Sequence, residues 1–212
     1  MFRSVLITGA LLFSMFHFVE SDAATFEIVE SSAGKKYLTM TGSIVENDEL
    51  EFKEILLSLI ADEKFDNTIF LNSPGGRLEA SLGIAKEVKD WGMTTAVLPS
   101  AKCHSGCALI WASGDLKMKH KDAVLGFHLA YISNLTATEN PYNDYLAMEG
   151  WHKLIMAIEW QVLEEMINYR EVLDIKDFGK FMKGYMFTTK DIFWLPEKEE
   201  LEETFNNVHV YE

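Results

Sequence analysis

Apolar residues recur at two different spacings along this chain, and the change of spacing predicts a mixed fold. The runs 25–29 and 36–41 have the pattern of short β-strands separated by a turn, and 68–71 is a short apolar strand that runs into a turn. Segment 48–61 instead repeats apolar residues every three to four positions, which predicts a helix with one buried face and with Asp48 capping its start.

The same alternation continues through the middle of the chain. We expect a helix over 78–91, a strand over 94–98, a helix over 105–112 and a strand over 123–128. Strands that alternate with helices favour parallel pairing through right-handed crossovers. The pattern therefore predicts one α/β domain whose parallel sheet is flanked by helices.

The last third of the sequence has a more helical pattern. A long helix is expected over 142–169, a short one over 178–184 and a further helical segment over 188–203, followed by an extended piece over 206–211. Trp151 and Trp160 on the long helix are candidates for a subunit interface, although such a stripe also suits a core.

The first residues have the pattern of an export signal. Arg3 supplies the positive start, 5–19 is almost wholly apolar, and Ser21-Asp22-Ala23 offers small residues for cleavage. We expect a signal peptide over 1–23 and a mature domain over 24–212. The apolar stretch is shorter than the roughly 20 residues that span a bilayer, which favours a cleaved signal over the alternative, an uncleaved membrane anchor.

Length and net charge limit the kinds of partner that the protein is expected to bind. A chain of 212 residues can bury one substantial core. Its formal net charge of -14 opposes contact with phosphate backbones and anionic lipid surfaces. We therefore expect neither nucleic-acid binding nor stable membrane insertion after signal cleavage.

Cys103 and Cys107 are the two cysteines of the sequence. In an exported protein they can form a disulfide, since one helical turn brings residues four apart within bridging range. Two buried thiols on one helix face are the alternative. With His104 they are too crowded for a zinc site, and no metal or cofactor is predicted.

Ser105 is the candidate nucleophile. It stands where the chain enters the predicted helix 105–112, and Gly106 after it allows close approach to the backbone and leaves an amide free to donate. The turn 72–76, Asn-Ser-Pro-Gly-Gly, ends a strand and offers a second donor through Gly76, although such a turn is often only a turn.

His128 is the candidate base because it ends the apolar strand 123–128, and strand ends in such sheets face the crevice. A hydrogen-bonded core histidine is the alternative. No comparable arrangement surrounds His104, His120, His152 or His209.

Four motifs along the chain, taken in their order, resemble the motifs of a known protein family. Residues 39–44 (TMTGSI), 69–76 (IFLNSPGG), 103–108 (CHSGCA) and 126–128 (GFH) resemble the Clp protease proteolytic subunit and its crotonase-like relatives, above all an exported periplasmic branch. The resemblance covers 36–129 well and the last third loosely. It implies a crotonase-like ββα superhelix with parallel sheets flanked by helices.

The resemblance also implies roles. It makes Ser105 the nucleophile, His128 the general base and the amides of Gly76 and Gly106 the oxyanion hole. The family's triad carboxylate has no counterpart, because Tyr185 stands at that position. The remaining candidates to orient His128 are Tyr185 itself and three aspartates, Asp174, Asp177 and Asp191.

The implied function is an ATP-independent serine hydrolase, a peptidase acting on peptides or unfolded proteins, exported to the bacterial periplasm or secreted, and assembled as a homo-oligomer. A catalytically silent scaffold of the same fold is one alternative. An acyl-thioester enzyme is another, although coenzyme A thioesters are not expected outside the cytoplasm. The sequon at Asn134 indicates glycosylation only in a eukaryotic secretory protein.

Overall fold

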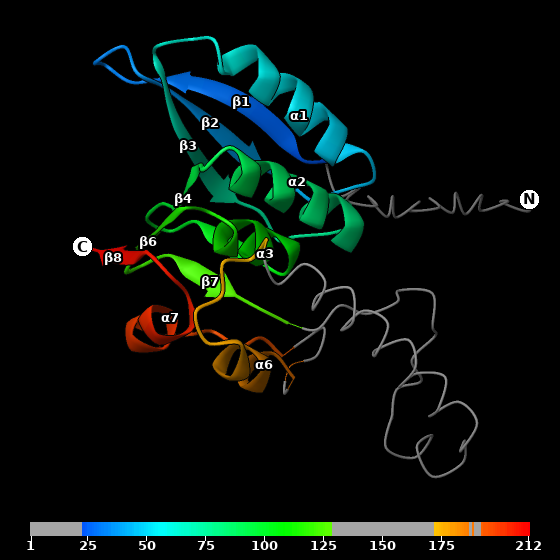
Figure 1. The fold of residues 1–212 in the computed structure, drawn as a ribbon, viewed down its shortest axis with the longest axis vertical. Helices are drawn as coiled ribbons and strands as arrows, with labels where there is room; N and C mark the ends of the chain where they lie inside the picture. Colours follow the sequence, from blue (N-terminus) through cyan, green and yellow to red (C-terminus); the bar gives the residue numbers. More distant parts are fainter. Residues whose placement is uncertain (1–22, 129–171, 187, 189–191) are drawn as a thin grey trace, which may run out of the picture.

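The structure is a computed structural model that describes residues 23–128, 172–186, 188 and 192–212. In this part of the chain a six-stranded sheet has the order β1-β2-β3-β4-β6-β8. Figure 1 shows this sheet, with the carboxyl-terminal strand at the edge far from β1. Its strands are β1 (Thr25–Glu30), β2 (Lys36–Thr41), β3 (Phe65–Asn72), β4 (Thr94–Val97), β6 (Leu116–His120) and β8 (Val208–Tyr211).

Pairing in this sheet is mostly parallel. The strands from β2 to β8 pair in parallel, as the alternation of strands and helices predicts. The exception is β1, which pairs with β2 antiparallel because a tight turn joins them, closed by Ser31 and Gly34. The short turn leaves no chain for a crossover, so only this edge departs from the expected pairing.

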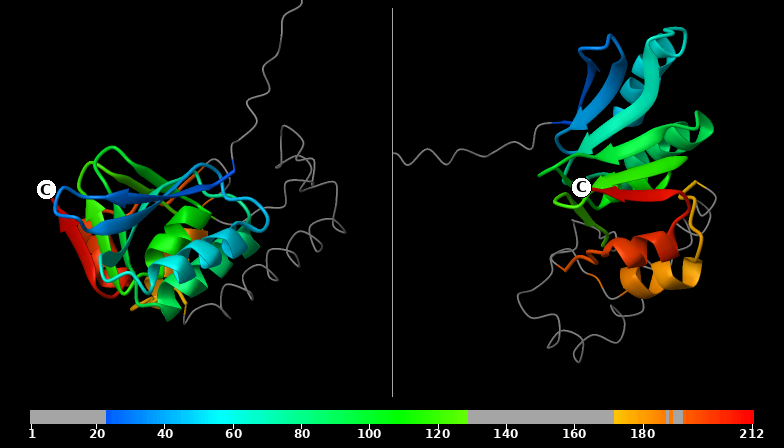
Figure 2. Two further views of the ribbon diagram at one scale, coloured as in Figure 1. Left: turned by 90° about the horizontal axis from the view of Figure 1, so that it is seen from above. Right: turned by 90° about the vertical axis from the view of Figure 1, so that its left-hand side faces the viewer.

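Helices α1 (Asp48–Leu59), α2 (Leu78–Asp90) and α3 (Gly106–Ala112) lie side by side on one face of the sheet (Figure 1 and Figure 2). The α1 boundaries confirm the predicted helix, but the predicted cap is wrong. Asn47 precedes the helix with φ 74, and Asp48 is buried, where its Oδ2 accepts a hydrogen bond from the Val45 amide. Burial raises the pKa of Asp48.

Two further strands form a separate sheet that carries the motif residues. Strands β5 (Lys102–His104) and β7 (Val124–Gly126) pair in parallel. The sequence pattern did not predict β5 or β6. β5 is three residues long, and β6 inverts the usual alternation, because Lys117 is fully buried while Leu116 is exposed.

The carboxyl-terminal segments also differ from expectation. Helix α6 (Phe178–Met186) matches the short predicted helix. The helix expected over 188–203 is confirmed only in its last part and is wrong over 192–197, since α7 spans Lys198–Thr204 and begins beyond Pro196 with a capping box from Glu197 and Glu200. Residues 192–195 are not helical, and Trp194 bridges Phe127 antiparallel.

The predicted leader and the long helix over 142–169 lie outside the described residues, apart from Ala23. Among the helices that are described, none is both long and apolar enough to cross a bilayer.

Aromatic rings join the second sheet to the carboxyl-terminal helices. The Phe127 ring lies 5.4 Å from that of Trp194, 5.6 Å from that of Phe205 and 5.9 Å from that of Phe181. Phe127 directly follows β7 and Phe205 directly follows α7, so these contacts pack α6, the end of α7 and the segment around Trp194 against the end of β7.

Candidate active site

Ser105 occupies a sharp turn between a strand and a helix. It follows β5 and precedes α3 with φ 55 and ψ −125, a conformation that non-glycine residues rarely adopt. Such backbone costs about 1–3 kcal/mol and persists where surrounding contacts fix it, as at the nucleophile elbows of hydrolases. The Ser105 amide donates to the Gly126 carbonyl oxygen at 2.8 Å, which extends the β5–β7 ladder into the turn.

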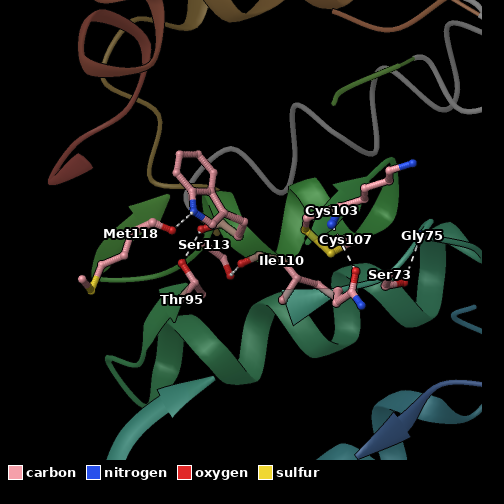
Figure 3. The surroundings of a disulfide bond; sticks show 11 residues. Ser73, Gly75, Thr95, Cys103, Cys107, Ile110, Ser113 and Met118 are labelled. Carbon is pink, nitrogen blue, oxygen red and sulfur yellow. Dashed lines mark hydrogen bonds between the residues drawn. A yellow bond between two sulfur atoms is a disulfide. The ribbon is translucent and has the colours of Figure 1, made fainter. Parts of the chain in front are cut away.

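A disulfide encloses this turn. Cys103 and Cys107 are bonded to each other with their Cα atoms 5.1 Å apart, and both are fully buried (Figure 3). Cys103 belongs to β5 and Cys107 to α3, so the bond joins the strand to the helix on either side of Ser105. The disulfide thus limits how far the two arms of the turn can separate.

Reducing this bond is expected to lower the free energy of unfolding by about 2 kcal/mol, because a closed loop of five residues removes only a little entropy from the unfolded chain. Urea unfolding of the oxidised and the reduced protein measures the difference. A Cys103→Ala/Cys107→Ala variant, compared with and without reductant, controls for other effects of the reductant. Equal midpoints for oxidised and reduced wild type would contradict the expectation.

The loop after β3 lies against Ser105. The Ser73 amide donates to the Lys102 carbonyl, and the His104 amide donates to the Ser73 carbonyl, so this loop pairs with β5. Gly75 has φ 89, and a Cβ on it would lie 2.7 Å from both the Gly106 nitrogen and the Ser105 Cβ. Only glycine permits this approach.

Two amides in this contact have no acceptor in the described part of the chain: those of Gly76 and Gly106. The Gly75 amide, by contrast, donates to Ser73 Oγ at 3.0 Å. A Cβ built on Gly106 would lie 3.6 Å from the Gly76 nitrogen, so the two unpaired amides are close neighbours beside Ser105. Two such donors are what an oxyanion hole requires.

Gly106 is glycine for a reason that the sequence did not reveal. A Cβ at this position would lie 2.8 Å from the Cβ of Ser81, a fully buried residue of α2 whose hydroxyl donates to the Arg77 carbonyl. The absence of a side chain therefore lets α3 pack against α2, in addition to leaving the amide accessible.

His128 lies at the same end of the second sheet as Ser105. His104 of β5 pairs with Gly126 of β7, and His128 follows two residues later. Parallel neighbours are about 4.8 Å apart, so the chain leaves both strands on one side. His128 is buried. His128 and Ser105 are both described, and no hydrogen bond joins them. Catalytic hydrogen bonds often form only when substrate binds.

His104, for which the sequence predicted no role, is a neighbour of His128. Alternation places His104, Gly126 and His128 on one face of the β5–β7 sheet, a signal that required knowledge of the pairing. The His104 Nε2 is buried and, within the described residues, has no hydrogen-bond partner. Burial, then the charges of Lys102 and His128, lower the pKa of His104, which favours a neutral imidazole.

The candidates for a third triad member are differently engaged. Both carboxylate oxygens of Asp174 contact lysines, Lys117 at 2.7 Å and Lys89 at 3.5 Å. Asp177 accepts the Lys180 amide at 3.0 Å in the first turn of α6. Asp191 lies outside the described residues. Tyr185 is buried and its ring stacks on that of Phe181 at 5.3 Å.

These contacts argue against Asp174 as the residue that orients His128, because both of its carboxylate oxygens already pair with lysines, one of them the fully buried Lys117. Tyr185, Asp177 and Asp191 stay predictions as groups that could orient His128.

No protein-family model and no curated protein matches this sequence. Solved structures do match its fold. A ClpP1 mutant from Listeria monocytogenes aligns with a TM-score of 0.53 and 15% identity, over 80% of this chain and 87% of that chain. A mutant of the membrane-bound stomatin-specific protease 1510-N aligns with a TM-score of 0.43 and 18% identity, over 82% and 77%. The chain thus has a Clp protease-like α/β fold with a mostly parallel sheet.

Proposed function

We propose that this protein is a serine hydrolase with a Clp protease-like fold, a peptidase in which Ser105 is the nucleophile and His128 the general base. The amides of Gly76 and Gly106 form the oxyanion hole. A crotonase-like arrangement of ββα units and assembly into a homo-oligomer belong to the same proposal.

The observation that carries this proposal is the backbone at Ser105. The strained φ of 55 turns the residue out between β5 and α3, where two amides without acceptors in the described chain adjoin it. A serine with only a structural role has no need of this combination. The positions of Gly76 and Gly106 match the donors that acyl transfer requires, and His128 leaves the neighbouring strand at the same end.

The reaction follows from these positions. Ser105 Oγ attacks the carbonyl carbon of a peptide bond as its proton passes to an imidazole nitrogen of His128. The carbonyl oxygen becomes an oxyanion that accepts hydrogen bonds from the Gly76 and Gly106 amides. The C–N bond then breaks, His128 returns the proton to the leaving amine, and water hydrolyses the acyl–Ser105 ester by the same steps.

Export to the periplasm or secretion from a bacterium is part of the proposal. The apolar stretch 5–19 with Arg3 before it has the pattern of a signal peptide. The Cys103–Cys107 disulfide supports an oxidising compartment, where such bonds persist. Hydrolysis there proceeds without an ATP-dependent unfoldase, so the proposed substrates are peptides or already unfolded proteins.

Intact-mass labelling with a fluorophosphonate tests the proposal. We expect a single adduct on the mature protein, no adduct on Ser105→Ala, and labelling of His128→Gln that is slower by about 100-fold or more, because the hydroxyl then lacks its base.

Ser113→Ala is a matched control, since Ser113 is a fully buried serine whose hydroxyl donates to the Ile110 carbonyl. A folded wild-type protein that forms no adduct refutes the hydrolase and favours a binding or scaffold role for the fold.

A further inference from the structure

The extended segment 192–195 adds to the second sheet beside β7. The Phe127 amide donates to the Trp194 carbonyl at 3.0 Å, and the Trp194 amide donates to the Phe127 carbonyl at 2.8 Å. This antiparallel pair fixes the register, so Phe193 falls opposite His128 and Leu195 falls opposite Gly126.

Trp194 anchors this segment in the aromatic core. Its ring lies 5.4 Å from that of Phe127 and 6.1 Å from that of Phe181. A Cβ on Gly184 of α6 would lie 2.5 Å from Trp194 Cε2, so the indole also packs closely on that helix. Because successive residues of a strand point to opposite faces, a fixed Trp194 directs Phe193 to the face of His104 and His128.

Phe193 contacts both imidazoles on this face. Its ring centroid is 4.7 Å from that of His128, with the planes at 67°, and 4.9 Å from that of His104, with the planes at 42°. The first is a T-shaped arrangement that aromatic pairs favour. Gly126 makes the contact possible, because a Cβ there would lie 3.1 Å from both Phe193 Cδ1 and His104 Cδ2.

We infer that Phe193 is a positioning residue for His128, holding the imidazole in the orientation from which it takes the proton of Ser105. The inference rests on the proposed function. The Phe193 ring restricts rotation of the imidazole about its side-chain bonds. Trp194 is packed in the aromatic core and so fixes the backbone that positions the Phe193 ring. The position of the base thus depends on how the carboxyl-terminal part of the chain packs against β7.

The experiment compares Phe193→Leu with Phe193→Tyr. The leucine keeps apolar bulk but removes the ring, whereas the tyrosine keeps the ring. We expect the fluorophosphonate to label Phe193→Leu about 10-fold more slowly than wild type, and Phe193→Tyr within about twofold of it. Leu195→Ala is the matched control, since Leu195 belongs to the same segment, is 54% exposed and contacts Gly126. It should label like wild type.

Nuclear magnetic resonance of the histidine ring protons supplies a readout that does not need activity. The ring current of Phe193 displaces the His128 signals in wild type and in Phe193→Tyr, and we expect that displacement to disappear in Phe193→Leu. His128→Gln assigns the signals. Circular dichroism and thermal unfolding establish that each variant is folded.

The possible failures are distinguishable. An unlabelled wild type refutes the proposed hydrolase. A labelled wild type with an equally fast Phe193→Leu refutes only the role of Phe193, as do His128 signals that stay in place in the leucine variant. Slow labelling of both Phe193→Leu and Phe193→Tyr also overturns the inference, because the ring alone then does not suffice.

Discussion

Gly76→Ala is expected to reduce fluorophosphonate labelling by about 100- to 1,000-fold, the loss that follows removal of one oxyanion donor. Gly76 has φ 157, and a Cβ there would lie 2.7 Å from the carbonyl carbon of Ile44 and even closer to its oxygen. That oxygen accepts the Arg77 amide at 2.9 Å, while the Ile44 amide donates to the Gly75 carbonyl at 2.9 Å. Because the collision is with backbone, no change of rotamer relieves it, and the Gly76 amide must move away from Ser105.

Gly92→Ala is the matched control for this variant. Gly92 also has a positive φ, of 58, but a Cβ there has nothing within 4 Å. We expect it to cost about 1–2 kcal/mol of stability from backbone strain alone and to leave labelling unchanged. Labelling rates and thermal unfolding of both variants separate lost chemistry from lost stability. A folded Gly76→Ala protein that labels at the wild-type rate would exclude Gly76 from the oxyanion hole.

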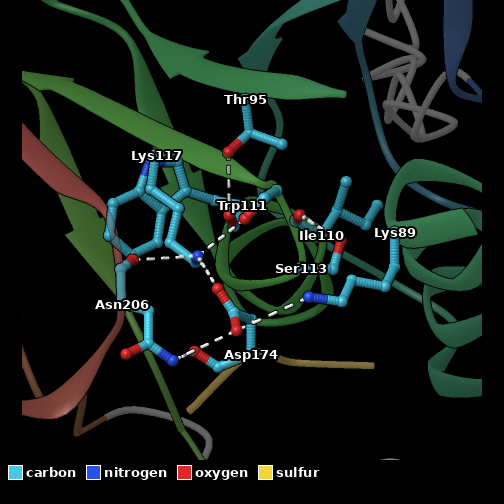
Figure 4. Close-up of polar contacts among 9 residues, drawn as sticks. Lys89, Thr95, Ile110, Trp111, Ser113, Lys117, Asp174 and Asn206 are labelled. Atoms are coloured by element: carbon cyan, nitrogen blue, oxygen red, sulfur yellow. Dashed lines mark hydrogen bonds and ion pairs between the residues drawn. The ribbon is translucent and has the colours of Figure 1, made fainter. Parts of the chain in front are cut away.

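Asp174→Ala is expected to lower the free energy of unfolding by about 3–5 kcal/mol, because it leaves a buried charge without its partner. Lys117 is fully buried, and its Nζ donates to Asp174 Oδ2 at 2.7 Å, to the Gly114 carbonyl at 2.6 Å and to the Asn206 carbonyl at 3.0 Å (Figure 4). The ion pair joins β6 to the residues before α6, and the hydrogen bond to Asn206 joins β6 to the residues before β8. A domain of ordinary stability has about 5–15 kcal/mol, so this loss brings the protein near unfolding.

Two controls define the origin of that loss. Asp174 has φ 48, which asparagine tolerates better than alanine, so Asp174→Asn removes the charge with less backbone strain. Asp90→Ala breaks the exposed Lys86–Asp90 pair of α2 and should cost less than about 0.5 kcal/mol. Urea unfolding at neutral pH measures all three. A loss for Asp174→Ala no larger than that for Asp90→Ala would contradict the assignment.

The same ion pair predicts a dependence on pH. Burial opposes ionisation of Asp174, but the hydrogen bond and charge of Lys117, together with Asn206 and Lys89, leave the pKa of Asp174 below its usual value. A carboxyl whose pKa is lowered on folding contributes stability above its unfolded pKa of about 3.9 and loses it as the pH falls through the lower folded pKa. The difference in unfolding free energy between wild type and Asp174→Asn should therefore narrow between about pH 5 and about pH 2. Urea unfolding across this range measures it, and a constant difference would contradict the prediction.

The sequence predicted the elements whose periodicity arises locally. The helices from 48 and 78 and the strands from 25 and 36 have the expected starts, and each contributes buried apolar residues to the same core. The turn into a helix at Ser105 and the unpaired amide of Gly106 were also predictable, because small residues before an apolar helix mark such a junction. Strand β5, on the other side of the turn, was not predictable because it has only three residues. The helix expected over 188–203 was right for 198–203 and wrong for 192–197, because Pro196 and the pairing of Trp194 with Phe127 outweigh the helical composition there.

The sequence by itself determined which residues have the chemistry for a site: a serine at a turn, two glycine amides and a histidine at a strand end. Only the tertiary structure decided how they are held, because that depends on contacts between residues far apart in the chain. The pairing of β5 with β7 brings His104 to the face of His128. The packing of Ser81 requires a glycine at 106, and the aromatic core directs Phe193 to the imidazole. Asp174, a candidate to orient His128, instead pairs with Lys117. A buried ammonium needs an anionic partner, and no local sequence pattern indicates which residue supplies it.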